Sequence, residues 1–115
     1  WATTSDQRIK KNIVDSTIGL SEINQLKIRN FEYRTEDEIT DFDNPKSVFV
    51  DKSGVQVGVI AQEIQTVLPK TIKEESTGVL TVNPDNLTWH LVKAIQELSA
   101  KNDVLEARIT TLEGV

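Results

Sequence analysis

The sequence predicts a small mixed α+β domain with short helices and β-hairpins, which ends in a long C-terminal helix. Three observations indicate this class. Short apolar runs alternate with polar residues on either side of glycines, which is typical of hairpin strands. One segment in the middle of the chain carries apolar residues at the spacing of a helix. The last part of the chain keeps an uninterrupted heptad pattern. A length of 115 residues suits one domain with a single core.

Composition and charge argue against several classes of protein. Thirteen basic and 18 acidic residues give a net charge of -5, which disfavours a general nucleic-acid coat. The absence of cysteine removes disulfide frameworks and cysteine-based zinc sites. The sequence holds no apolar run near the roughly 20 residues that cross a bilayer. We therefore expect no cofactor, no metal, no nucleic acid and no membrane partner. The first residue is not methionine and no signal-peptide pattern follows it, which indicates a fragment of a longer protein.

The first half of the chain predicts a short helix, a strand and a loop, after a polar start. Leu20, Ile23 and Leu26 lie about one helical turn apart. In residues 30–34, aromatic side chains alternate with polar ones, as in a half-buried strand. Residues 36–46 are acidic. Because these acids lack the spacing of a calcium loop, we expect a solvated loop there.

The centre of the chain predicts a hairpin followed by a helix. Residues 48–50 and 55–57 flank a turn to which Gly54 contributes. The helix is predicted by the spacing of four apolar residues, Ile60, Ile64, Val67 and Leu68. Pro69 follows directly and is expected to end it.

A second hairpin and a helix start follow. Residues 71–74 and 79–82 flank a turn that contains Gly78, and both runs have the composition of strands. Asn83 or Asp85 is then expected to cap the last helix, since short polar side chains accept hydrogen bonds from free amides at helix starts.

The C-terminal helix shows the clearest physical pattern. Its core positions repeat with alternating steps of four and three residues: Leu91, Ile95, Leu98, Asn102, Leu105, Ile109 and Leu112. We call this set the seam. Lys101 precedes Glu106 by five residues, and Arg108 precedes Glu113 by five, which are the opposite-charge pairs that meet between parallel helices. The pattern therefore predicts parallel self-association, and the alternative is one amphipathic helix packed on its own domain.

The number of strands in the coiled coil stays open on periodicity alone. Isoleucine and one Asn at the first core position, with Leu at the other, favour dimers in isolated zippers. Three heptads are a short sample, and the part of the domain that precedes them would dominate the choice.

We divide the chain into a body over residues 1–86 and a coiled-coil helix over residues 87–115, which together form one functional domain.

Residues 5–13 carry the most specific pattern. They read Ser-Asp-Gln-Arg-Ile-Lys-Lys-Asn-Ile, which resembles the signature Ser-Asp-x-Arg-x-Lys-x-Asn-Ile of the phage intramolecular chaperone family, classed among self-cleaving peptidases. The resemblance continues in order through the aromatic residues of 31–33, the Gly-Val-Ile-Ala-Gln-Glu of 58–63, residues 80–82 and the last helix. It therefore covers nearly the whole chain.

The resemblance implies a C-terminal domain of a trimeric, β-helical tail fibre or tail spike. Such a domain brings three chains into register, assists their folding and is then released by autoproteolysis. The implied partners are two further copies, giving a homotrimer, and the upstream fibre or spike of the same chain. The implied setting is the host bacterial cytoplasm during virion assembly, with release from the mature virion after cleavage.

The resemblance also implies the site residues. Ser5 carries over as the nucleophile and Lys10 as the general base, and the scissile bond adjoins Ser5, at Ser5–Asp6. The implied supporting residues are Arg8, Asn12, Gln56, Gly58 and Glu63. Gln56 stands where several relatives carry histidine.

A Ser-Lys pair works only under one condition. A serine hydroxyl is a poor nucleophile until a base removes its proton, and a lysine in water is protonated at neutral pH. Desolvation, or cations such as Arg8 and Lys11, favours the neutral amine. The one histidine, His90, lies far away in sequence and suits a surface or an interface. We therefore hypothesise that assembly buries Lys10 or brings a neighbour's group to Ser5.

Other interpretations stay open at this point. A non-cleaving oligomerisation module at the end of a fibre explains the heptads without any Ser-Lys pair. A third interpretation places this domain inside a membrane-bound transcription factor resembling myelin regulatory factor. For single residues, Glu63 is favourable at the positive end of a helix whatever the chemistry, and Trp89 suits an interface or a core.

Overall fold

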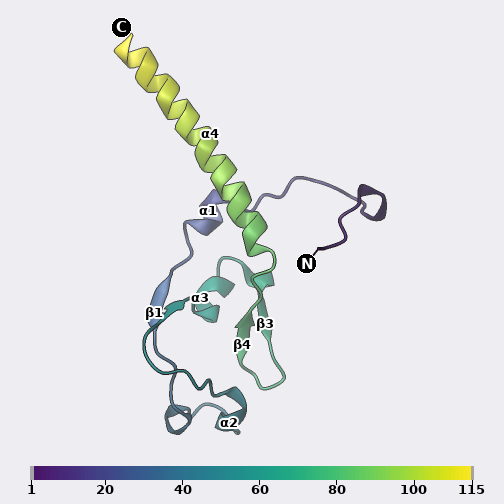
Figure 1. Ribbon diagram of the computed structural model, residues 1–115, viewed down its shortest axis with the longest axis vertical. Helices are drawn as coiled ribbons and strands as arrows, with labels where there is room; N and C mark the ends of the chain where they lie inside the picture. The colour runs from purple at the N-terminus through teal and green to yellow at the C-terminus, as the bar shows by residue number, and fades with distance from the viewer. Residues whose placement is uncertain (1, 115) are drawn as a thin grey trace.

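The computed structural model describes residues 2–114, which form a small mixed body and a long helix that projects from it (Figure 1). The α-helices are α1 (Leu20–Ile23), α2 (Pro45–Val48), α3 (Ala61–Gln65) and α4 (Leu87–Glu113). The strands are β1 (Arg29–Phe31), β2 (Gln56–Gly58), β3 (Ile72–Glu74) and β4 (Leu80–Val82). Short 3-10 helices occur at η1 (Gln7–Ile9), η2 (Glu36–Glu38) and η3 (Pro69–Thr71).

The second predicted hairpin is confirmed. Strands β3 and β4 pair antiparallel, with Ile72 opposite Val82 and Glu74 opposite Leu80. The turn between them contains Gly78 at φ 89°, a left-handed conformation that glycine adopts without steric cost. The amide of Gly78 donates to the carbonyl of Glu75 at 2.9 Å, which closes the turn.

The first predicted hairpin is wrong. Residues 45–48 form helix α2, because Pro45 occupies its first turn, where the missing N–H does no harm and the fixed φ suits a helix. Strand β2 pairs instead with β1, from Arg29 opposite Gly58 to Phe31 opposite Gln56. A Cβ on Gly58 would lie 3.1 Å from the Phe31 ring, so the missing side chain gives that ring its room.

The predicted strand and central helix are both shorter than expected. Strand β1 ends at Phe31, and Tyr33 lies beyond it with its ring edge-on to Phe31 at a centroid distance of 5.1 Å. Helix α3 ends at Gln65, and a last turn carries the chain on to Leu68, whose amide donates to the Ile64 carbonyl at 2.8 Å. Pro69 then opens η3, which keeps the chain turning.

The core of the body is small and lies around α3 and η3. Ile64 and Leu68 are each 4% exposed. Buried beside them, Thr71 donates its hydroxyl to the Leu68 carbonyl at 2.7 Å, and its own carbonyl accepts the amide of Asn83 at 2.7 Å. These bonds join the end of the α3 segment to Asn83, the residue that follows β4, so the second hairpin is attached to the core.

Replacing Leu68 with alanine should destabilise the body strongly. We expect a loss of about 2 to 5 kcal/mol in the free energy of unfolding, because a buried methyl cluster is removed and leaves a cavity. Urea unfolding at a fixed protein concentration measures this loss. Val55→Ala is the control, since Val55 is 68% exposed and should change stability by about 0.5 kcal/mol or less. Equal effects of the two substitutions would contradict the position of the core.

Helix α4 begins at Leu87 and spans 27 residues, about 40 Å. The predicted caps are wrong: Asn86 holds the capping position without a side-chain bond, and Asn83 accepts the amide of Asp85 instead, at 3.0 Å. Helix α1 packs on the first turns of α4, as Figure 1 shows. Gly19 lies close against α4 there, and a side chain at this position would require the end of the Glu97 side chain to move.

The chain leaves much apolar surface uncovered. Its accessible surface is 9898 Å², whereas a compact monomer of this mass exposes about 6,300 Å². Its radius of gyration is 20.3 Å, against about 13 Å for a compact domain of this length. Within residues 2–114, the buried hydrophobic side chains are those of Ile64, Leu68 and Ala94. None of the helices described is long and apolar enough to cross a membrane. Many large apolar side chains therefore remain accessible to water in the single chain.

Candidate functional site

The η1 turn brings Ser5 and Lys10 together. Lys10 Nζ donates to Ser5 Oγ at 2.6 Å, although the two residues are five apart in sequence. The turn between them folds the chain back, since the amide of Ile9 donates to the Asp6 carbonyl at 3.1 Å and that of Lys10 to the Gln7 carbonyl at 3.1 Å. Both side chains are exposed. The pair is therefore formed by local structure alone.

Asp6 caps this turn. Its Oδ1 accepts the backbone amide of Arg8 at 2.8 Å, and its Oδ2 accepts Nη2 of the Arg8 side chain at 2.8 Å. The side-chain bonds from Arg8, followed by the backbone bond, lower the pKa of Asp6, and Asp6 raises the pKa of Arg8. Arg8 thus has its charge paired with Asp6, whereas we expected it to act on Lys10. Each of the four fixed residues of Ser-Asp-x-Arg-x-Lys therefore takes part in a side-chain hydrogen bond within the turn.

Replacing Asp6 with alanine should slow the self-cleavage that the resemblance implies by about tenfold, because the turn that holds Ser5 against Lys10 loses its cap. The rate is measured from band intensities on a denaturing gel over time. Asp15→Ala is the matched control, since Asp15 is an exposed acid in the same exposed N-terminal arm, residues 2–17. Because the pKa of Asp6 is lowered, its capping carboxylate is fully present above the ordinary value of 3.8 and is lost as the pH falls through the lower value. An Asp6→Ala rate equal to the parent rate would contradict this role.

The contact between Lys10 Nζ and Ser5 Oγ brings an amine to hydrogen-bond distance of a hydroxyl. General-base catalysis by such a pair requires a neutral amine that accepts the hydroxyl proton, and removal of water favours the neutral form of an amine. Both side chains are exposed in the single chain, so removal of water would have to come from outside the turn.

The other expected site residues divide into two groups. Asn12, at φ 55°, adopts the left-handed conformation that Asn tolerates and redirects the chain after the motif. Gln56, Gly58 and Glu63 lie on β2 and α3, in the body, while η1 lies at the end of an arm on the other side of α4 (Figure 1). The structure therefore gathers Ser5, Asp6, Arg8 and Lys10, and it does not bring the body residues to them within one chain.

The body residues have structural roles of their own. Glu63 pairs with Arg29 through two bonds, at 3.0 and 2.6 Å, and so joins α3 to β1. The Arg29 guanidinium lowers the pKa of Glu63, and Glu63 raises the pKa of Arg29. The capping position of α3, Ile60, has no side-chain bond, so Glu63 acts as a partner for Arg29. Gln56 Nε2 donates to the carbonyls of Ser53 and Gly54, at 3.3 and 3.4 Å.

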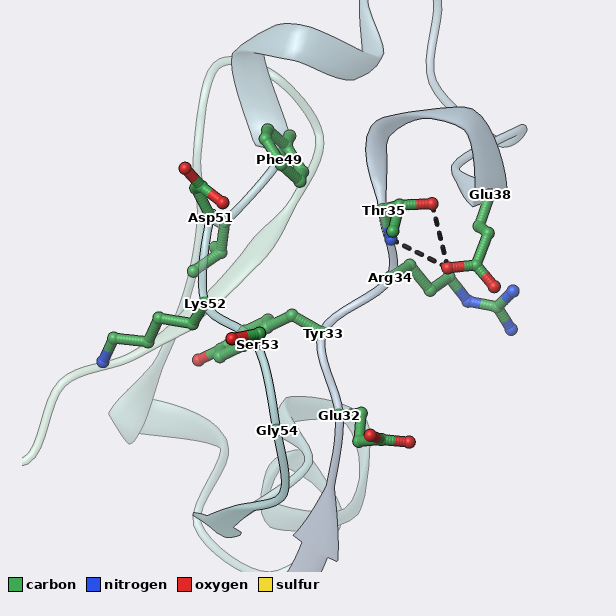
Figure 2. Close-up of a pocket in the computed structure, with 11 residues that line it drawn as sticks. Glu32, Tyr33, Arg34, Thr35, Glu38, Phe49, Asp51, Lys52, Ser53 and Gly54 are labelled. Atoms are coloured by element: carbon green, nitrogen blue, oxygen red, sulfur yellow. Dashed lines mark hydrogen bonds between the residues drawn. The ribbon is translucent and has the colours of Figure 1, made fainter.

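A surface hollow of about 570 Å³ lies between residues 32–35 and residues 49–54 (Figure 2). Tyr33 and Phe49 give it an aromatic lining. On one side, Glu38 accepts the amide and the hydroxyl of Thr35, at 2.9 and 3.0 Å, and these bonds lower its pKa. The sequence offered no signal for this hollow, because its two walls come from segments that no local pattern connects.

The seam is exposed along the whole length of α4. The exposure of its apolar residues runs from 42% for Leu91 to 75% for Leu112. Helix α1 packs on α4, and Gly19 at its start lies against Lys93 and Glu97, which are not seam residues. The alternative of an amphipathic helix packed on its own domain therefore accounts for the contact with α1 and not for the exposed seam. Trp89 is 70% exposed, so it is no core residue of the single chain.

Comparison with known proteins agrees with the position of the motif. A family model named as a peptidase and described as "Chaperone of endosialidase" matches residues 5–73. A probable tail fiber protein of Escherichia phage Phieco32 is 27% identical over 111 residues. Myelin regulatory factor homolog 1 of Caenorhabditis elegans is 29% identical over 105 residues. Each match covers 91% of this chain, which spans only 13% of the first protein's length and 11% of the second's.

Proposed function

The chain belongs to the chaperone of endosialidase family, and on this basis we propose that it is the intramolecular chaperone of a phage tail fibre or spike. The related tail fiber protein supports this role. In the proposal the domain assembles as a homotrimer, helps the upstream part of the chain to fold, and then cuts itself off next to Ser5. This takes place in the host bacterial cytoplasm during virion assembly, and the mature virion lacks the domain.

The observation that carries the cleavage is the 2.6 Å contact between Lys10 Nζ and Ser5 Oγ. In the reaction, Ser5 Oγ bonds to the acyl carbon of the scissile peptide while its proton passes to neutral Lys10. Lys10 gives that proton to the departing amine as the carbon–nitrogen bond breaks. Water then hydrolyses the ester and restores the hydroxyl. The sum is one water added across one peptide bond, which needs no further reagent.

The observation that supports assembly is the exposed seam. In a parallel bundle, seams from separate copies cover one another and bury side chains that one chain leaves in water. Because α1 packs on the first turns of α4, parallel copies would release their N-terminal arms at the same end of the bundle. The upstream segments would thereby start in register and at high local concentration, which is what folding of an intertwined fibre requires.

Assembly and cleavage are coupled in this proposal. In the single chain, Ser5 and Lys10 are exposed to water, and a Ser-Lys pair acts only when its amine is neutral. Trimer formation removes water from the pair and so favours the neutral amine. A fibre that has not yet assembled therefore keeps its chaperone, and cleavage marks a completed trimer.

A second candidate comes from the worm relative. Its name supports the equivalent domain in a protein resembling myelin regulatory factor, with the same assembly and cleavage but a different upstream part. A permanent, non-cleaving fibre module is the third alternative, and the exposure of the Ser5–Lys10 pair supports it. The upstream sequence distinguishes the phage fibre chaperone from the domain of a protein resembling myelin regulatory factor. A cleavage assay distinguishes both from the non-cleaving module.

The test is to express the domain with about a hundred residues of its natural upstream sequence and to run a denaturing gel. The proposal expects two bands for the parent and one for Ser5→Ala. The mass of the C-terminal product locates the bond. A first residue of Asp6 fits the expected Ser5–Asp6 cut, although attack by Ser5 on its own carbonyl closes a strained four-membered ring. A product that begins at Ser5 would move the attack to the carbonyl of Thr4. An uncut parent would leave only the non-cleaving module.

A further inference from the structure

The N-terminal arm carries apolar side chains that nothing in the described chain covers. Ile9, Ile13 and Val14 are between 64% and 86% exposed. All of residues 2–17 are exposed, and the backbone hydrogen bonds of η1 stay within the arm. Figure 1 shows the arm leaving the side of α4 and extending away from the body. Three branched apolar residues within six positions are poorly suited to water, so the arm has the character of a docking segment.

A matching apolar face lies at the base of α4. Trp89 is 70% exposed and Val92 is 41% exposed. Steps of three residues lead from Trp89 through Val92 to Ile95, so these side chains are neighbours on the helix surface and the face runs into the seam. Helix α1 does not cover it, because α1 meets α4 where Ala94 is buried and where Gly19 approaches Lys93 and Glu97.

The arm and this face lie at the same height along α4. The arm is anchored at Gly19, against Lys93 and Glu97, and these residues are one to two turns from Trp89. Ile13 lies six residues before that anchor, which allows a reach of about 20 Å. Packed helices are about 8 to 10 Å apart, so the arm of one copy can reach the helix base of the next.

Charge favours the same pairing. Residues 1–18 hold three basic and two acidic residues, a net charge of +1. The other residues hold ten basic and 16 acidic ones, a net charge of -6. A weakly basic arm is therefore drawn to an acidic neighbour and is not repelled by it. In the single chain the arm leaves Trp89 uncovered, so the second copy is the occupant that can satisfy both surfaces.

We propose that Ile9, Ile13 and Val14 of one copy pack on Trp89 and Val92 of a neighbouring copy. This inference rests on the proposed trimer and names the surface that completes the cleavage site. Docking carries the Ser5–Lys10 turn onto the neighbour, because Ile9 directly precedes Lys10 in the chain. Water around the amine is then replaced by the indole and valine side chains, which favours the neutral base. Cleavage then depends on contact between the arm of one copy and α4 of a neighbouring copy.

The first test uses Trp89→Ala in the chain with its natural upstream segment. Cleavage should slow at least tenfold while the native mass stays that of the parent, because the seam is intact. Val92→Ala should also slow cleavage. Val104→Ala is its matched control, since Val104 is also exposed but lies on another face of α4, and it should cleave at the parent rate. Parent rates for Trp89→Ala and Val92→Ala would overturn the inference.

The second test uses the absence of native cysteine. Chains with Ile13→Cys are mixed with chains with Val92→Cys, both carrying Ser5→Ala, and are oxidised after joint refolding. The inference expects a disulfide between the two chains on a non-reducing gel, and none when Val104→Cys replaces Val92→Cys. A chain that carries both Ile13→Cys and Val92→Cys gives a second measurement. A disulfide that forms only within this one chain would overturn the inference, as would the absence of any disulfide.

The two tests distinguish failure of the docking surface from failure of the proposed trimer. A parent that associates and cleaves, but gives no crosslink and does not respond to Trp89→Ala, would overturn the docking surface and leave the proposed function standing. A parent that stays a single chain in solution would overturn both, because no second copy would then be present.

Discussion

Replacing Lys10 with alanine is expected to leave the protein uncut. In the proposed mechanism the Lys10 amine, 2.6 Å from the Ser5 hydroxyl, is the general base, and loss of a general base lowers rates by about a hundredfold to ten-thousandfold. The other residues of the turn offer no substitute, since Arg8 is paired with Asp6 and an arginine cannot give up its proton at neutral pH. The readout is the fraction cut after a fixed time, in the chain that carries its upstream segment.

Two further variants make this result specific. Lys11→Ala removes the adjacent exposed charge and should cleave at the parent rate. Lys10→Arg keeps the charge but not the ability to act as a base, and it should fail like Lys10→Ala. Cleavage by Lys10→Arg at the parent rate would show that only a positive charge is needed. Cleavage by Lys10→Ala would remove Lys10 from the mechanism.

Placing aspartate at both Leu98 and Leu105 is expected to abolish association and, with it, cleavage. Both residues lie in the seam and are 54% and 53% exposed in the single chain, so the change does little to one chain. In the bundle it would bury several like charges at successive layers, which should weaken association by at least about a thousandfold. Native mass and the denaturing gel are measured on the same preparation.

The matched control places aspartate at Ala100 and Ala107. These residues are also exposed and seven apart on α4, but they lie on the face opposite the seam. The cost in helix propensity is slightly larger for the alanine pair than for the leucine pair, so a loss of association confined to the seam variant must come from its position on the helix. The control should stay associated and cut. A double seam variant that is monomeric yet cleaves at the full rate would refute the coupling of cleavage to assembly.

Features that depend on neighbouring residues were predictable from the sequence. The β3–β4 pair is joined by a short turn with Gly78 at positive φ, and α4 contains the whole apolar repeat from Leu91 to Leu112. The hairpin expected over residues 48–57 failed because the true pairing joins β2 to β1, about 25 residues earlier. Nothing in the local pattern of β2 distinguishes one partner from the other. The expected caps failed because Asn83 forms a turn with Asp85.

The same difference between local and tertiary contacts applies to the residues of the candidate site. The closeness of Ser5 and Lys10 arises within six residues, and the motif predicted that the two act together. The role of Asp6 as the cap was missed, although an acid at the start of a turn is a signal that could have shown it. The link between Glu63 and Arg29 and the hollow beside Tyr33 depend on tertiary contacts that a single sequence does not display.

The native mass of the 115-residue chain tests the central claim most directly, because chaperone action and the control of cleavage both depend on assembly. Sedimentation equilibrium across a range of concentrations measures that mass without reference to shape. We expect three times the 12.9 kDa mass of one chain. A mass of one chain at every concentration would contradict the proposal, and a mass of two chains would contradict the trimer.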